Sequence, residues 1–167
     1  MMEITAKGDT LHLSGEPPHA GDTAPDFTLR KGPEQVTLAD LPRKPRLFSV
    51  VPAIETKTCT LQTRAFNDKL AAYGDSVAAY TISLDPPDLQ AHFCSTNGIE
   101  NMETLSDEPD HSFGESWGLV IQESGRLARS VFVLDADGKI AYAQVVPELT
   151  EEPDYAPALA ALDSLLG

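Results

Sequence analysis

Residues 46–59 read RLFSVVPAIETKTC, and they contain the strongest local pattern in the chain. Arg46 to Val51 form a near-continuous apolar run, which is typical of a strand buried on both faces of a sheet. Pro52 ends the run. From about Cys59 to Tyr73 the apolar residues recur at helical spacing. The stretch therefore predicts a buried strand followed by a helix with a cysteine at its start.

Outward from this stretch, strands and helices alternate along the chain. The predicted strands are Glu3–Thr5 and Thr10–Leu13 (an N-terminal hairpin), Ser76–Ser83, Met102–Leu105, Ser130–Leu134 and Ile140–Val145. The further predicted helices are Pro87–Asn97, Phe113–Trp117 and Pro153–Leu166. This order predicts an α/β fold whose central mixed β-sheet is flanked by helices and preceded by a β-hairpin extension. Thioredoxin-like folds have this order of elements.

The composition bounds the class of protein. The chain has 167 residues, which is typical of a single domain, here residues 1–167. It has 12 Lys and Arg against 26 Asp and Glu, a net charge of −14, which disfavours nucleic acid and membrane surfaces as partners. One acidic cluster is interpreted as solvated surface before the last helix: Glu148, Glu151, Glu152 and Asp154.

The beginning of the chain indicates where the protein acts. Met1 to Lys7 contain neither a basic segment nor an apolar one, so we expect a cytoplasmic protein. No apolar run approaches the ~18 residues that a membrane span requires.

The two cysteines, Cys59 and Cys94, are too few for a disulfide scaffold. Intracellular thiols are normally reduced, so a pairing between them would be chemical and not structural. The four histidines are scattered without metal-ligand spacing to either cysteine: His12, His19, His92 and His111. We therefore expect no metal site.

Cys59 occupies a position that suits a reactive thiol. At a helix start, free backbone N–H groups and the positive end of the helix dipole stabilise a thiolate. Lys57 and Arg64 add positive charge nearby, and Thr56 can cap the helix or hydrogen-bond the sulfur. The alternative is that Cys59 is a small buried apolar residue, and position alone leaves both interpretations open.

The residues around Cys59 also argue against disulfide exchange. Enzymes of that type carry Cys-x-x-Cys here, whereas this chain has Thr56 in the first slot. They also place a proline before the first strand of the later hairpin, where this chain has Ala128 and Arg129. The Arg129 guanidinium could stabilise a thiolate or hold a polar oxygen substrate, or form an ordinary surface ion pair.

The spacing Pro52-x-x-x-Thr56-x-x-Cys59 resembles the active-site motif of the peroxiredoxins, specifically the bacterial thiol peroxidase branch with two cysteines of the atypical type. The resemblance continues through residues 64–67, which read RAFN. The motif is specific because three residue types are fixed in spacing after a buried strand.

The resemblance covers nearly the whole chain. Residues 21–29 resemble a segment near the start of peroxiredoxins, and Phe93-Cys94 lie where thiol peroxidases keep their resolving cysteine. The N-terminal hairpin and residues 152–155 resemble the same branch. Residues 118–129 depart from it by being a few residues shorter than usual.

The resemblance implies roles for five residues. Cys59 would be the peroxidatic cysteine and Cys94 the resolving cysteine, which together form an intramolecular disulfide that thioredoxin reduces. Thr56 would hydrogen-bond the sulfur or the peroxide, Arg129 would hold the negative charge, and Pro52 would shield the site from water. The substrate would be hydrogen peroxide or an alkyl hydroperoxide, in antioxidant defence, with no cofactor and with a homodimer as the assembly.

Forming that disulfide places a demand on the fold. The Cα atoms must lie within about 7 Å, and a cysteine at one helix start and a cysteine on a separate helix do not meet this limit easily. We therefore expect local unfolding around one or both cysteines, for which the weakly helical residues 95–98 give room.

Two other functions use similar residues. A general thiol–disulfide reductase is disfavoured by the missing Cys-x-x-Cys. A peroxide-sensing redox switch, a binding module with the same cysteine pair, stays open because it uses the same chemistry. Turnover separates them, because an enzyme consumes many equivalents of peroxide and a sensor stops near one.

Overall fold

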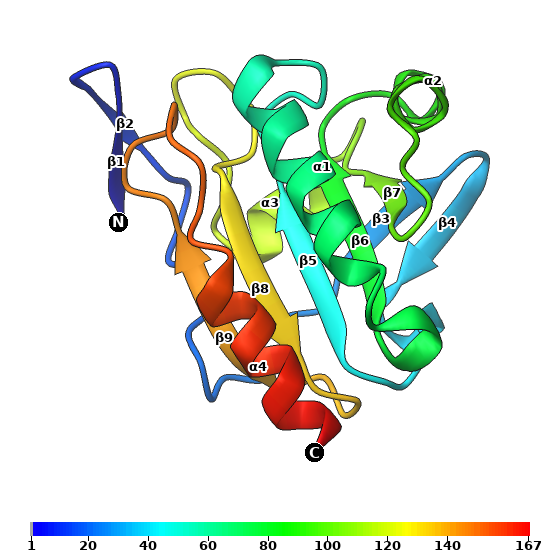
Figure 1. Cartoon of the computed structure of the whole chain (residues 1–167). Helices are drawn as coiled ribbons and strands as arrows, with labels where there is room; N and C mark the ends of the chain where they lie inside the picture. The colour runs from blue at the N-terminus through cyan, green and yellow to red at the C-terminus, as the bar shows by residue number, and fades with distance from the viewer. Residues whose placement is uncertain (1) are drawn as a thin grey trace.

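Seven strands form one mixed β-sheet in the computed structural model, which describes residues 2–167 (Figure 1). The strand order is β4-β3-β7-β6-β5-β8-β9. The strands are β3 (Thr28–Lys31), β4 (Glu34–Thr37), β5 (Arg46–Val50), β6 (Ala78–Ser83), β7 (Glu103–Ser106), β8 (Ser130–Leu134) and β9 (Ile140–Val145). The central strands β5, β6 and β7 are parallel, and the remaining pairs are antiparallel. The predicted mixed α/β fold is confirmed.

Helices cover both faces of this sheet. They are α1 (Lys57–Leu70), α2 (Pro87–Asn97), α3 (Ser112–Ser116) and α4 (Ala156–Leu166). Figure 1 shows α1 and α4 on the face towards the viewer and α3 behind the sheet. Two short 3₁₀ turns, Leu38–Asp40 and Gly74–Ser76, complete the helical structure among residues 2–167. None of the helices in this part of the chain is both long and apolar enough to cross a membrane.

Strand β5 is buried on both faces, as its apolar run predicts. All five of its residues are buried. Phe48 and Val50 pack into the cluster on the α3 face, whereas Leu47 packs with Phe66 of α1 and Leu162 of α4 on the other face. Because β5 is packed on both faces, its carboxyl end is held in place, and the loop that leads to α1 starts from this fixed point.

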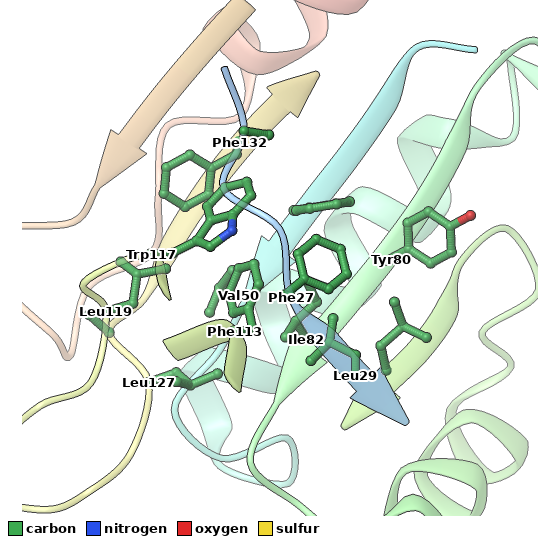
Figure 2. Packing of buried hydrophobic residues seen from close by; sticks show 14 of the residues in the cluster. Phe27, Leu29, Val50, Tyr80, Ile82, Phe113, Trp117, Leu119, Leu127 and Phe132 are labelled. Carbon is green, nitrogen blue, oxygen red and sulfur yellow. The ribbon is translucent and has the colours of Figure 1, made fainter. Parts of the chain in front are cut away.

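The core on the α3 face is rich in aromatic rings. Figure 2 shows Phe27, Phe113, Trp117 and Phe132 gathered there. Trp117 is fully buried and lies 4.7 Å from Phe113 and 5.0 Å from Phe132, measured between ring centroids. Rings at such separations add to the free energy of burial.

The N-terminal hairpin is confirmed as a separate two-stranded sheet, β1 (Glu3–Ala6) with β2 (Asp9–His12). It does not join the main sheet through β-strand pairing of its named strands. Instead Thr5 forms an isolated bridge with Glu148, in the connection between β9 and α4.

The structure differs from the sequence prediction in one missed hairpin and in the bounds of several elements, among them β6, which begins at Ala78 rather than Ser76. The hairpin of β3 and β4 was not predicted, because these are four-residue strands in which only Leu29 is fully buried. Helix α1 begins at Lys57, two residues before Cys59, and ends at Leu70 rather than Tyr73. Helix α4 begins at Ala156, three residues later than the predicted Pro153.

Candidate active site

Cys59 lies in the first turn of α1, beyond the carboxyl end of β5. Thr56 has an extended backbone and precedes the helix as its N-cap residue. The Cys59 side chain faces the sheet and is fully buried, in the apolar cluster that α1 and α4 form. Cys59 therefore lies in the first turn of the helix, two residues after its observed start, and the thiol is shielded from bulk water.

Arg129 reaches Cys59 because β8 pairs with β5. The antiparallel register aligns Ser130 with Val50, so the residue just before β8 lies beside the carboxyl end of β5. The Arg129 Nη1 donates to Cys59 Sγ at 3.4 Å, and Nε donates to the Leu149 carbonyl at 2.9 Å. Arg129 is only 3% exposed, so its interpretation as a surface ion pair is wrong.

Gln62 is a buried polar residue of the site that the sequence motif does not contain. It lies one turn after Cys59 and is fully buried. Its Oε1 accepts from Arg129 Nη1 at 3.1 Å, while its Nε2 donates to Ser49 Oγ at 2.8 Å. The available signal was its position three residues after Cys59, which places both on one face of a helix. Gln62 and Leu149 thus each bind a different nitrogen of the guanidinium.

Thr56 does not contact the sulfur. Its side chain is exposed, and its hydroxyl donates to the Ala53 carbonyl at 2.9 Å. It makes no side-chain capping bond to α1. The hydroxyl has one donor and two acceptor positions, so its oxygen keeps the ability to accept.

The loop from Val51 to Thr56 is held by other parts of the chain. Pro52 is buried, and its carbonyl accepts from Arg126 Nη1 at 3.2 Å. The Ile54 N–H donates to Asp85 Oδ2 at 2.7 Å. Asp85 belongs to the connection between β6 and α2, so this bond links the loop before Cys59 to the base of the helix that carries Cys94.

Cys94 is a half-buried thiol on α2, and both cysteines are free. It packs against the same apolar cluster that contains Cys59. Burial raises the pKa of the Cys94 thiol, and a hydrogen bond with Thr104 opposes this rise. Cys94 is therefore held as a neutral thiol over a wider pH range than an exposed cysteine.

Among residues 2–167, no group of three His, Cys, Asp or Glu side chains could hold a metal ion.

Comparisons with known proteins agree with this architecture. The Redoxin family model matches residues 19–159. A thiol peroxidase of Bacillus subtilis (strain 168) is 48% identical over 167 residues, which cover 99% of each chain. The crystal structure of a peroxiredoxin-like protein from Aquifex aeolicus has 30% identity and a TM-score of 0.90, covering 99% of this chain and 98% of that one. A thiol peroxidase from Chromobacterium violaceum, 18% identical over 98% of this chain and 96% of its own, shares the fold with a TM-score of 0.87.

The fold and the site define a thioredoxin-like protein with a single cysteine, rather than a Cys-x-x-Cys pair, at the start of its first long helix. The matched family model spans most of the chain, and the Bacillus relative spans nearly all of it. The chain belongs to the redoxin family and, within the peroxiredoxins, to the thiol peroxidases.

Proposed function

We propose that this protein is a thiol peroxidase in which the Cys59 thiolate reduces hydrogen peroxide and alkyl hydroperoxides. The observation that carries the proposal is the buried contact between Arg129 Nη1 and Cys59 Sγ, at 3.4 Å. A guanidinium beside a buried sulfur favours the negatively charged form of that sulfur. The thiolate, and not the thiol, is the nucleophile.

The first step transfers one oxygen atom. The thiolate attacks the terminal peroxide oxygen, an S–O bond forms, and the O–O bond breaks. Sulfur is oxidised to a sulfenic acid, and the departing oxygen takes up a proton and leaves as water or alcohol. The Arg129 guanidinium stabilises the negative charge as it moves from sulfur to oxygen.

Thr56 and Pro52 serve the same step. Because the Thr56 hydroxyl proton is used on Ala53, its oxygen is the acceptor left for the O–H of the peroxide. The buried Pro52 ring limits the access of water to the sulfur.

In the second step Cys94 attacks the sulfenic sulfur. A disulfide forms within the chain, and the sulfenic oxygen leaves as water. A dithiol reductant, for which we propose thioredoxin, then returns two electrons and two protons to the cysteines. Because Cys59 lies at the start of α1 and Cys94 on the separate helix α2, we expect this step to include local unfolding around one or both cysteines.

The remaining assignments complete the proposal. They are a single domain over residues 1–167, a homodimer, action in the cytoplasm and a role in antioxidant defence, without metal or organic cofactor.

The test is a thiol count with an intact mass on reduced protein, before and seconds after one equivalent of hydrogen peroxide. We expect both thiols to disappear with a loss of two hydrogens, and a Cys94→Ser variant to stop at the sulfenic acid, which dimedone traps. Continued peroxide consumption with thioredoxin and its reductase would distinguish an enzyme from a redox switch that stops near one equivalent. Retention of both thiols would overturn the proposal.

A further inference from the structure

A short segment, residues 147–150, lies between the N-terminal hairpin and the candidate active site. Figure 1 shows the blue hairpin beside the orange connection from β9 to α4, where this segment belongs. On the hairpin side, Thr5 N donates to the Pro147 carbonyl at 2.8 Å, and Leu149 N donates to the Thr5 carbonyl at 2.7 Å. These backbone bonds dock the hairpin on the segment.

The Glu148 side chain adds further hydrogen bonds between this segment and the hairpin. One of its carboxylate oxygens accepts from the Thr5 hydroxyl at 2.8 Å. The other accepts from Lys7 N at 3.3 Å, from Thr150 N at 3.0 Å and from the Thr150 hydroxyl. These donors hold the pKa of Glu148 down at about 2. Glu148 is therefore a surface residue, as predicted, whose carboxylate is also hydrogen-bonded to the hairpin and to Thr150.

On its other side the segment contacts the site directly. The Leu149 carbonyl accepts from Arg129 Nε, and the Thr150 carbonyl accepts from the Thr58 hydroxyl in the first turn of α1, at 3.1 Å. One short segment thus provides an acceptor for the arginine and an acceptor for the helix that carries Cys59. The position of Leu149 decides which way the guanidinium fork is turned, because Nε and Nη1 are fixed relative to each other in one plane.

We propose that Glu148 is a positioning residue for Arg129, through which the N-terminal hairpin sets the orientation of the guanidinium towards Cys59. The inference deepens the proposed peroxidase function and rests on it for its effect on rate. Glu148 touches neither cysteine. It acts by holding the Leu149 carbonyl where Arg129 Nε can donate to it while Nη1 faces the sulfur.

The test compares three variants in a Cys94→Ser background, where Cys59 is the one remaining thiol. Glu148→Gln replaces an acceptor oxygen with an amide that faces donors, and Thr5→Val removes the hydroxyl that bonds Glu148. Glu151→Gln is the matched control, because it removes the same charge three residues along from an exposed side chain. Three quantities are measured: the rate of Cys59 with hydrogen peroxide, the pH profile of Cys59 alkylation, and the hydrogen exchange of the Arg129 Nε–H by NMR.

We expect Glu148→Gln to slow the reaction with peroxide by about tenfold, since small misplacement of a catalytic group is costly. We also expect the alkylation profile to move to higher pH and the Nε–H to exchange faster. Thr5→Val should change all three in the same direction by less, and Glu151→Gln should leave them as in the parent. A merely structural role would lower thermal stability without moving the alkylation profile.

An Arg129 Nε–H and an alkylation profile that stay unchanged in folded Glu148→Gln protein would overturn the inference. If Glu148→Gln fails to fold, the Arg129 Nε–H exchange and the alkylation profile of Thr5→Val are measured instead, and unchanged values there overturn the inference. If the parent does not react with peroxide while both other readouts respond to Glu148→Gln, the positioning role holds and the proposed function fails.

Discussion

At the scale of single residues, Arg129 joins parts of the site that come from distant points in the sequence. Its guanidinium donates to a sulfur, an amide oxygen and a backbone carbonyl, on Cys59, Gln62 and Leu149. A planar fork can serve acceptors in different directions at once, whereas an ammonium is a point charge on a flexible stem. The geometry therefore requires arginine in particular, and not just a positive charge.

Arg129→Lys tests this requirement. We expect the second-order rate constant of Cys59 with hydrogen peroxide to fall by about 100-fold, because one ammonium cannot hold the sulfur and the Leu149 carbonyl in the same geometry. Stopped-flow kinetics on folded protein measure the effect. The control is Arg43→Lys, an exposed arginine paired with Asp137, which should react as the parent does. A rate within threefold of the parent would mean that charge alone suffices.

Asp107 is a buried carboxyl whose pKa is raised by burial and lowered by hydrogen bonds. It is 2% exposed, and its oxygens accept from the N–H groups of Phe113 and Gly114, both at 2.8 Å. These donors favour the charged form, but burial outweighs them and raises the pKa of Asp107 from 3.8 to about 6.

A pH dependence of stability follows from this pKa. Below about pH 4 the carboxyl is protonated in both the folded and the unfolded chain. Between about pH 4 and about pH 6 the unfolded chain has lost the proton and the folded protein keeps it, so the free energy of unfolding falls as pH rises. The fall attributable to Asp107 is about 3 kcal/mol, and it ends above about pH 6.

Urea unfolding of the parent and of Asp107→Asn across this range measures the difference. The variant should be less stable overall, since one amide oxygen cannot replace two carboxylate acceptors, and this part of the pH dependence should disappear. Asp110→Asn, an exposed change in the same turn, should keep the parent's curve. Parallel curves for the parent and Asp107→Asn would show that Asp107 titrates alike in both states.

At the scale of elements, the loop before Cys59 is held from two sides. Arg126 binds the Pro52 carbonyl, and Asp85 binds the Ile54 N–H. Asp85 precedes α2, so the bond ties the segment that carries one cysteine to the base of the helix that carries the other. This bond therefore restrains the loop before Cys59 in the reduced protein.

Asp85→Ala should separate the two proposed steps. Without the carboxylate the loop is less ordered, so we expect the reaction of Cys59 with peroxide to slow several-fold while the disulfide with Cys94 closes faster. Rapid-quench mass spectrometry follows the sulfenic acid and the disulfide separately. Asp88→Ala removes an exposed carboxylate from the first turn of α2 and should leave both rates unchanged. Slower closure in Asp85→Ala would indicate that the bond guides the two cysteines together.

At the scale of the whole molecule, the charge is strongly unbalanced. The chain has twenty-six acidic side chains and twelve Lys and Arg. The ion pairs described among residues 2–167 lie at the exposed surface, such as Lys31 with Glu103 at 2.6 Å. Exposed pairs contribute little, so repulsion among carboxylates dominates the long-range electrostatics.

Salt should therefore stabilise this protein. Raising NaCl from about 0.01 M to about 0.15 M shortens the screening length from about 30 Å to about 8 Å, which weakens the repulsion. We expect the midpoint of thermal unfolding to rise by several degrees. KCl should act alike, and sucrose of equal osmolality should not reproduce the effect. A midpoint that falls with salt would mean that the surface ion pairs outweigh the repulsion.

The elements that can be predicted from the amino-acid sequence are those whose pattern is local. The apolar run of β5, the helical spacing of α1, and the segments β8 and β9 follow from neighbouring residues, and β8 and β9 were predicted with their observed bounds. Cys59 follows a buried strand and stands at the beginning of a helical pattern, and this position likewise predicts that it lies in the first turn of a helix. Local patterns are readable because burial on one or two faces repeats every two or every 3.6 residues.

Which distant residues contact each other is known from the folded chain alone. Arg129 is 70 residues from Cys59 in the sequence and reaches it through the antiparallel register of β5 and β8. The Thr5 contact with Glu148 spans 143 residues, and the Thr56 hydroxyl turns to Ala53 rather than to the sulfur. Such contacts depend on strand register and on the competition between acceptors in the folded chain, and neither quantity is a property of the residues next to them in the sequence.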